Sequence, residues 1–303
     1  KLGLKTGIAV TSQINHATPA GFSSHNESRH NYDQIADSYF DSKVDGKFVL
    51  DVMLGGGWKF FIREDRNLVS EFKQAGYQYA DKYEQLEQLS MGKPTLGLFA
   101  DKGLPWALDS SHKSRLPLLT QTAVKHLENP KGFFLLVEAS QVDWAGHAND
   151  IASAMTEMHD LALTISFLHD YVEANPDTLV ILTADHSTGG LTIGAKGEYR
   201  WSPEFLQNMK ASASTIAQGM VNEEKPGDYV ADKLGLTLTE EELATFASVA
   251  KQDDATRYSA VKTFVDNKTN TGWTTTGHTG VDVEVFAFGA GHASFIGQID
   301  NTD

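Results

Sequence analysis

The sequence is notable first for what it lacks. Its 303 residues include no cysteine, so neither a disulfide nor a thiolate metal ligand is available, an absence that is compatible with any cellular compartment. No apolar run approaches the roughly 18 residues of a membrane-spanning helix, so we expect no membrane partner. Basic residues are also scarce, with 25 Lys and Arg against 40 Asp and Glu. The resulting net charge of −15 would repel the phosphates of nucleic acid, which we therefore exclude as a partner.

The patterning of the chain predicts an α/β fold. Hydrophobic residues make up 41% of the sequence, which is enough for a large core. Short β-rich runs alternate with helical patterns, and this alternation favours a mostly parallel central sheet with helices on both faces. Strands are expected at residues 7–12, 48–54, 132–138, 178–184 and 283–289. We expect a single α/β domain over residues 1–303, with its N-terminal part missing.

Two helices are predicted between these strands. One covers 118–127, where Pro117 is tolerated in the first turn. The other has apolar residues at helical spacing, which predict one buried face: Ala154, Met158, Leu161, Ile165 and Leu168.

The beginning of the chain and one internal segment depart from the alternating pattern. Residues 1–7 read as the end of a helix that leads into a strand, so we expect an upstream part belonging to the same sheet. Residues 191–272 are too long for a simple connection and carry helix signals of their own. Gly235 marks a helix end, and Thr239 with Glu242 forms a capping box. We therefore predict an inserted helical subdomain at 191–272.

Carboxylate and imidazole side chains follow or precede three of the predicted strands. Asp143 and His147 are four residues apart, so on a helical turn they share one face. Asp185 and His186 follow the strand at 178–184, and His278 precedes the last strand. These residue types suit Zn²⁺, and clustering them in one crevice would place two ions close enough to act on one substrate.

Each of these segments also has an ordinary structural interpretation. Asp143 could simply favour the N-terminus of a helix, with His147 as a surface residue. Adjacent residues such as Asp185 and His186 point to opposite faces of a strand unless the chain bends. Gly189 and Gly190 make such a bend plausible. The order of the three segments and their strand context together favour the metal site.

Four motifs carry a resemblance to a known family. They are His-Ala-Thr-Pro-Ala at 16–20, Val-Glu-Ala-Ser-Gln-Val-Asp-Trp-Ala-Gly-His-Ala-Asn at 137–149, Thr-Ala-Asp-His-Ser-Thr-Gly-Gly at 183–190 and Gly-His-Thr-Gly at 277–280. In this order they resemble bacterial alkaline phosphatase, over the chain from its first strand to its last.

The resemblance implies two Zn²⁺ ions and one Mg²⁺ ion. The first zinc would be held by Asp143, His147 and His278, and the second by Asp185 and His186. Magnesium would be held by Glu138 and Thr18, with His16 beside it. Arg29 lies where the family has the arginine that clamps the substrate phosphate, a role suited to a guanidinium. Trp144 would wall the phosphate pocket, although core packing is the alternative.

The chain departs from the family pattern in two respects. Some members have Asp and Lys where this chain has His16 and Trp144, and the His/Trp pair resembles a branch that includes cold-adapted and marine enzymes. The family's nucleophilic serine and an aspartate that bridges the second zinc and the magnesium lie upstream of the first strand, outside this chain. Ser140 lies between proposed ligands, but the sequence gives it no adjacent base and does not favour it as a substitute.

The resemblance therefore implies metal-dependent hydrolysis of phosphate monoesters through a phosphoseryl intermediate. A phosphodiesterase or phosphomutase of the same superfamily could use the same metals. A non-catalytic metal-binding fragment is the alternative from a different class of protein. The family also suggests a homodimer that is periplasmic or secreted.

Overall fold

The computed structural model describes residues 3–297 and divides into two compact units. The first unit is Lys1–Gln141 and the second is Val142–Asp303. No helix among the described residues is long and apolar enough to cross a membrane.

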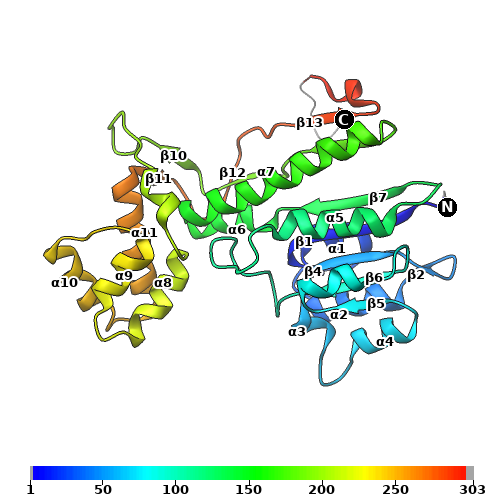
Figure 1. Ribbon diagram of the computed structural model, residues 1–303, viewed down its shortest axis with the longest axis horizontal. Coiled ribbons are helices and arrows are strands. Elements are labelled where there is room, and N and C mark those ends of the chain that lie inside the picture. The colour runs from blue at the N-terminus through cyan, green and yellow to red at the C-terminus, as the bar shows by residue number, and fades with distance from the viewer. Residues whose placement is uncertain (1–2, 298–303) are drawn as a thin grey trace. The chain divides into compact units, whose positions relative to one another are not determined.

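The first unit is built on a five-stranded parallel sheet (Figure 1). Its strand order is β5-β6-β4-β1-β7, so β1 lies between β4 and β7. The strands of the sheet are β1 (Lys5–Gln13), β4 (Val52–Gly56), β5 (Gln78–Ala80), β6 (Thr95–Leu98) and β7 (Phe133–Glu138). A small hairpin is formed by β2 (Lys43–Val44) and β3 (Lys47–Phe48). The helices are α1 (Ala17–Ser23), α2 (Tyr32–Asp41), α3 (Trp58–Phe61), α4 (Leu68–Gln74), η1 (Tyr83–Gln88) and α5 (Arg115–Leu127).

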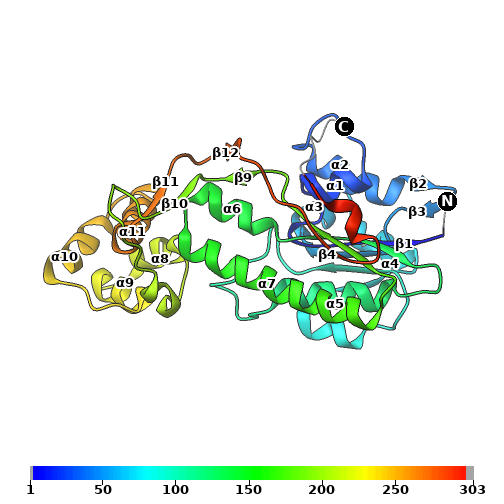
Figure 2. The same ribbon diagram turned by 90° about the horizontal axis from the view of Figure 1, so that it is seen from above.

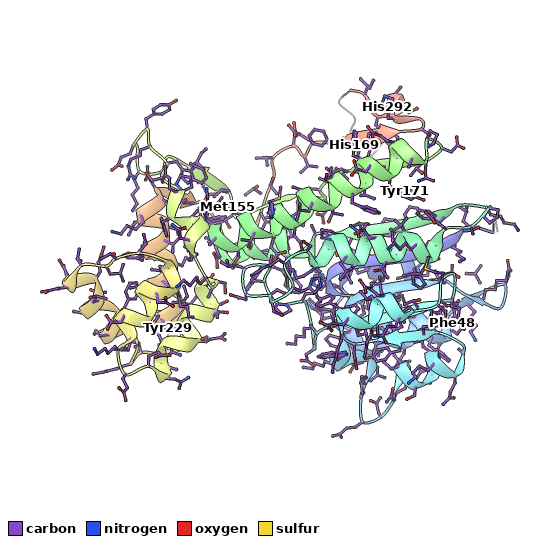
Figure 3. The ribbon with its side chains drawn as sticks, viewed as in Figure 1. Phe48, Met155, His169, Tyr171, Tyr229 and His292 are labelled. Atoms are coloured by element: carbon purple, nitrogen blue, oxygen red, sulfur yellow. The ribbon has the colours of Figure 1, made fainter. Side chains whose placement is uncertain are left out.

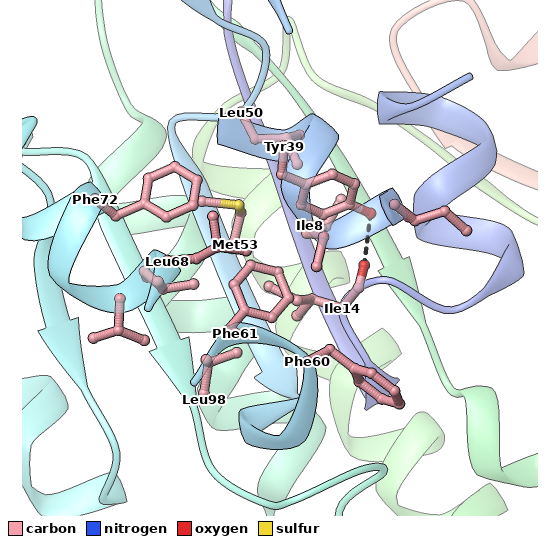
Figure 4. Packing of buried hydrophobic residues seen from close by; sticks show 14 of the residues in the cluster. Ile8, Ile14, Tyr39, Leu50, Met53, Phe60, Phe61, Leu68, Phe72 and Leu98 are labelled. Atoms are coloured by element: carbon pink, nitrogen blue, oxygen red, sulfur yellow. Dashed lines mark hydrogen bonds between the residues drawn. The ribbon is translucent and has the colours of Figure 1, made fainter. Parts of the chain in front are cut away.

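Helices cover both faces of this sheet because its strands are apolar on both sides (Figures 1 and 2). Ile8 and Val10 of β1 join one buried cluster, whereas Ala9 between them joins the other. The first cluster packs the sheet against α2, α3 and α4 (Figure 4). The hydroxyl of Tyr39 on α2 donates to the carbonyl oxygen of Ile14 at 2.7 Å and fixes that helix at the end of β1. The second cluster packs the sheet against α5.

The prediction of a mostly parallel sheet with helices on both faces is confirmed. Strands expected at 7–12, 48–54 and 132–138 correspond to β1, β4 and β7 with shifted ends. The helix end expected at 1–7 is wrong over 5–7, where β1 has already begun, and residues 1–2 lie outside the described residues. Strands β5 and β6 were not predicted, because three or four residues give too short a pattern to recognise.

The second unit begins within helix α6 (Ser140–Ala148) and contains no large sheet among its described residues. It has three antiparallel strand pairs, β8 with β13, β9 with β12, and β10 with β11. Its strands are β8 (Leu179–Leu182), β9 (Ser187–Thr188), β10 (Leu191–Ile193), β11 (Thr271–Trp273), β12 (His278–Thr279) and β13 (Phe286–Gly289). Its helices are α7 (Ile151–Ala174), η2 (Glu204–Asn208), α8 (Ala213–Gly219), η3 (Met220–Asn222), α9 (Pro226–Leu234), α10 (Glu240–Val249), α11 (Asp254–Thr269) and η4 (His292–Phe295).

The strands expected at 178–184 and 283–289 form β8 and β13, but they pair with each other and not with the parallel sheet. Their apolar side chains are therefore only partly covered: Ile181 is 47% exposed and Phe286 is 55% exposed. The edge strand β7 in the first unit shows the same feature, with Phe134 at 48%. The central sheet predicted from the sequence, with helices on both faces, would bury these segments, and that burial is not found in the described chain.

Helix α7 confirms the predicted helix but not its buried face. Met158, expected inside, is 49% exposed, whereas Glu157 and Asp160 are each 1% exposed. Met155 and Tyr171 lie along the same helix (Figure 3). The spacing of apolar residues identifies an apolar stripe on the helix. It does not identify the side of the helix against which the neighbouring strands β8 and β13 pack.

Residues 191–272 form a helical segment whose two ends meet. β10 pairs with β11 so that Leu191 lies opposite Trp273, and helices α8 to α11 lie between these strands in the sequence (Figure 1). Gly235 ends α9 in the left-handed conformation, and the capping box of Thr239 and Glu242 opens α10 as predicted. The assignment of 191–272 as a subdomain inserted into one domain stays a prediction.

Candidate metal centre

Helix α6 places the first two proposed ligands on one face. Asp143 and His147 are separated by one helical turn, and Asp143 Oδ2 lies 3.5 Å from His147 Nε2. The i,i+4 arrangement expected from the sequence is confirmed. Their side chains are 34% and 40% exposed, so a small ion could reach them.

His147 is oriented by a backbone carbonyl from a distant part of the chain. Its Nδ1 lies 2.5 Å from the carbonyl oxygen of Thr276, which can only accept, so Nδ1 carries the ring proton. The unprotonated Nε2 lies 3.2 Å from Nε2 of His278. Ligand bonds of about 2.0 Å at tetrahedral angles put two ligand nitrogens about 3.3 Å apart. The two histidines therefore have the spacing of a zinc-ligand pair, with Asp143 completing a group of three.

His186 joins this group through its ring and through Thr188. The rings of His186 and His278 stack with their centroids 3.4 Å apart. The hydroxyl of Thr188 donates to Asp143 Oδ1 at 2.5 Å, so it accepts from His186 Nδ1 at 3.3 Å. In a neutral His186 ring the proton then lies on Nδ1, and Nε2 can bind an ion.

Asp185 lies beside this nitrogen. Its Oδ2 is 3.2 Å from His186 Nε2. Imidazole and carboxylate together are a donor set that suits zinc. The structure thus brings together all five residues proposed to hold zinc.

Glycines allow the segments of this centre to approach closely. Gly189 and Gly190 have φ of +84° and +58°, which confirms the predicted bend after His186. Gly146 on α6 faces β9, where an added Cβ would lie 2.9 Å from Thr188 Cβ and 3.0 Å from its carbonyl oxygen. The Gly in Trp-Ala-Gly-His is therefore needed for α6 to pack against the strand that carries Thr188.

The remaining proposed residues lie in the first unit, except Trp144. Glu138, at the end of β7, accepts from the hydroxyl of Ser140 at 2.6 Å. His16 is the N-cap of α1, and its Nε2 lies 3.4 Å from Nη2 of the exposed Arg29. Thr18 lies in the first turn of α1 and is partly buried.

Ser12 and Ser140 lie beside Glu138, and Ser12 was not predicted from the sequence. Ser140 has a neighbouring carboxylate after all, contrary to expectation, but it is only 5% exposed. Its Oγ also lies 3.0 Å from Ser12 Oγ and accepts from the Ser12 amide at 3.1 Å. The hydroxyl of Ser140 therefore serves to hold Glu138 and is too buried to attack a substrate.

In the second unit Thr188 and Thr276 orient the histidines, and neither residue was predicted from the sequence. Thr188 lies in the motif at 183–190, two residues after His186. This spacing is the only feature of the sequence that indicates its role in orienting His186. Thr276 acts through its backbone carbonyl, which no residue type reveals. Trp144 is partly buried on α6 between Asp143 and the buried Ala145.

A second group of possible ligands lies on the exposed side of α7. His169, Asp170 and Glu173 are close together, with His169 Nδ1 3.6 Å from Glu173 Oε1. All three are exposed, and the ring of His169 lies 5.8 Å from that of Phe288 between centroids. His169 is labelled in Figure 3. A substitution in this exposed group serves below as a control for substitutions in the metal centre.

Comparisons with known proteins agree with the geometry. A sequence profile of the family described as Alkaline phosphatase matches residues 1–303. Alkaline phosphatase 4 of Bacillus subtilis is 45% identical over 305 residues, which cover 99% of this chain and 66% of that protein. The chain thus spans slightly less than two thirds of that relative's length.

Solved structures give the same result. The cold-active alkaline phosphatase of a psychrophilic Shewanella species superposes with a TM-score of 0.92 at 45% identity, covering 99% of this chain and 73% of that one. A variant of the alkaline phosphatase of the Antarctic bacterium TAB5, with Mg bound in its M3 site, gives a TM-score of 0.66 at 25% identity and covers 97% of this chain and 68% of that one. With the profile match over all of residues 1–303, these findings show that the chain belongs to the alkaline phosphatase family.

Proposed function

We propose that the protein containing this chain hydrolyses phosphate monoesters with the help of two Zn²⁺ ions and one Mg²⁺ ion. The observation that carries the proposal is the convergence of two imidazole nitrogens and a carboxylate at Asp143, His147 and His278. A family member with such a centre has the groups that metal-assisted phosphoryl transfer requires.

The residues of the second unit fit zinc by their donor chemistry. Asp143, His147 and His278 would hold the first ion, and Asp185 with His186 would hold the second. When bound, such ions polarise the phosphoryl group and stabilise the charge that develops on the attacking and leaving oxygens. The chain itself orients two of these rings, because Nδ1 of His147 donates to the carbonyl of Thr276 and Nδ1 of His186 lies 3.3 Å from the hydroxyl of Thr188.

Magnesium would be held by Glu138 and Thr18, with His16 nearby. Hard oxygen donors suit this ion, and the carboxylate of Glu138 is already oriented by Ser140. The magnesium in the structure of a variant of the TAB5 relative supports an ion of this type.

The substrate phosphate would be bound by Arg29 and walled by Trp144. A guanidinium can donate two parallel hydrogen bonds to phosphate oxygens, and Arg29 is exposed and able to reach solvent. The attacking serine would come from the part of the relatives' length that this chain does not span. Its product would be a phosphoseryl group that water then hydrolyses.

The intact protein can be tested with a phenolic phosphate monoester and the corresponding diester, before and after chelation. We expect turnover of the monoester, loss on chelation, and recovery when zinc and magnesium return. The variant His278→Ala should lose at least 100-fold in kcat/KM, because second-shell changes alone typically cost 10–100-fold. His169→Ala removes an exposed histidine from α7 and should retain activity.

Other results would favour the other functions. Faster turnover of the diester would support a phosphodiesterase, and isomerisation of a sugar phosphate without release of phosphate would support a phosphomutase. Zinc binding without turnover of any ester would support a non-catalytic metal-binding protein.

We also propose that the protein is a homodimer located in the periplasm or outside the cell. The support for both is membership of the family, together with a cysteine-free sequence that tolerates an oxidising compartment. Light scattering at micromolar concentration and fractionation of cells that produce the protein test the two statements separately. A monomeric mass, or recovery in the cytoplasmic fraction, would refute them.

A further inference from the structure

Helix α6 ends at a residue whose backbone is unusual. Asn149 has φ of +52°, the left-handed conformation that glycine adopts most readily and asparagine tolerates. Its amide donates to the carbonyl of Gly146 at 3.0 Å, and the next amide, of Asp150, donates to the carbonyl of Ala145 at 3.0 Å. These two bonds close the helix directly after His147 and Ala148.

The side chain of Asn149 makes a second connection that closing the helix does not require. With its carboxamide oriented to satisfy both neighbours, its nitrogen donates to the carbonyl of Gly146 at 2.8 Å and to that of Thr275 at 3.0 Å. Asn149 is 8% exposed, so water competes little for this nitrogen. A glycine would end the helix at least as well, but it could not reach Thr275.

Thr275 belongs to the segment that carries the opposing histidine. The carbonyl of its neighbour Thr276 accepts a hydrogen bond from Nδ1 of His147, and His278 follows two residues later. The same segment is fastened to Gly189, whose amide donates to the carbonyl of Gly277 at 2.9 Å and whose carbonyl accepts from the amide of Thr274 at 3.1 Å. The carboxamide of Asn149 thus connects the end of α6 to this segment at Thr275. This bond is separate from the one between His147 and Thr276.

We propose that Asn149 is a positioning residue that sets the separation of His147 and His278, an inference that rests on the proposed metal-dependent function. It holds the 274–278 segment against the end of α6, so that both Nε2 atoms face one point. Residues that orient metal ligands from behind typically contribute 10–100-fold to metal affinity.

Two substitutions separate positioning from other roles. Asn149→Gly keeps the left-handed backbone and removes the carboxamide. Asn149→Asp keeps the shape but turns an oxygen toward two carbonyl oxygens, which repels the segment. By charge alone the new carboxylate would strengthen zinc binding, whereas loss of positioning weakens it. The sign of the change for Asn149→Asp therefore distinguishes the two effects.

Tyr258→Phe is a matched control. The hydroxyl of Tyr258 donates to the carbonyl of Ala148 at 2.7 Å, one residue before Asn149, but it connects α6 to α11 and not to the 274–278 segment. This variant should lower the melting temperature of the metal-free protein and leave zinc affinity within about twofold, because it removes a hydrogen bond of ordinary strength away from the ligands.

The measurement is competition for zinc between the intact protein and a chromophoric chelator, with the melting temperature of each metal-free variant recorded in parallel. Both Asn149 variants are expected to bind zinc about 10–100-fold more weakly than the unsubstituted protein. If the unsubstituted protein retains zinc and both variants bind it equally well, the positioning role is refuted while the proposed function stands. If the unsubstituted protein binds no zinc, the proposed function fails and this inference fails with it. If one variant does not fold, the other decides the outcome.

Discussion

His147 and His278 hold their Nε2 atoms 3.2 Å apart although 131 residues separate them in the sequence. Because Nδ1 of His147 donates to the carbonyl of Thr276, its Nε2 can accept a hydrogen bond from His278 or bind an ion. The pair is therefore organised before any ion binds, which reduces the entropy lost on binding.

Zinc content tests this organisation directly. We expect about two zinc ions per chain in the intact protein purified without chelators, following the two-ion arrangement of such centres. His278→Ala should lose about one of them, and His169→Ala should lose none. Elemental analysis of the dialysed proteins checks the prediction, and an unsubstituted protein without zinc would contradict it.

Gly146→Ala should disturb the same centre through packing alone. The new Cβ would meet the backbone of Thr188, so β9 must move and carry the hydroxyl of Thr188 away from Asp143. Overpacking of this kind costs roughly 1–3 kcal/mol. We expect a lower melting temperature and weaker zinc binding, measured by denaturation and by chelator competition.

Gly21→Ala is the control for that substitution. Gly21 lies in α1 with no atom within 4 Å of an added Cβ, so alanine there should raise stability by up to about 1 kcal/mol. Equal effects of the two substitutions would show that the close approach at Gly146 is unimportant.

Arg29→Ala should weaken the binding of inorganic phosphate. Loss of a charge-assisted, bidentate contact is worth roughly 1.5–3 kcal/mol, or about ten- to a hundred-fold in the inhibition constant. Zinc content should not change. Arg200→Ala, which removes an exposed arginine paired with Glu198 at 3.1 Å, should leave phosphate inhibition as it is. An unaltered inhibition constant in Arg29→Ala would assign that residue to the ordinary surface.

Trp144→Lys should tighten phosphate binding if residue 144 faces the substrate. An indole has one neutral donor, whereas an ammonium group adds a charge. If release of phosphate limits turnover, the same variant should lower kcat. The comparison is with Trp144→Phe, at alkaline pH. Identical phosphate affinities for the two variants would leave packing as the whole role of Trp144.

The buried His126 predicts a loss of stability in mild acid. It lies on α5 with 2% of its surface exposed, and burial lowers its pKa below the ordinary 6.5. The unfolded chain then binds a proton that the folded chain excludes, so the free energy of unfolding falls as pH drops from about 6.5 through the lower pKa of the folded state. Above pH 6.5 this contribution is fully present.

Denaturant unfolding between pH 5 and 8 measures the effect. His126→Gln should show a shallower loss of stability over that range than the unsubstituted protein, because glutamine does not titrate. Parallel curves for the two proteins would show that another group is responsible.

The sequence predicts the parts of this molecule that depend on local patterns. The spacing of Asp143 and His147, the glycine bend after His186 and the capping box at Thr239 all appear in the structure. Each is determined by a few consecutive residues and by simple backbone geometry.

Features that depend on distant partners were not predictable. The antiparallel pairing of β8 with β13 and the exposure of Met158 depend on which surfaces pack together. Hydrophobic periodicity does not predict which surfaces these are. The roles of Thr276 and Asn149 involve backbone carbonyls, which every residue possesses, so no residue type marks them.

The pairing of β10 with β11 bears on the order in which the chain folds. Bringing His186 and His278 together directly would require closing a long loop, at an entropic cost that rises with loop length. The pairing of Leu191 with Trp273 closes most of this loop, so that once the intervening helices have folded only a short closure remains. The metal centre should therefore form late, and the length of the helical segment could vary among relatives without disturbing the ligands.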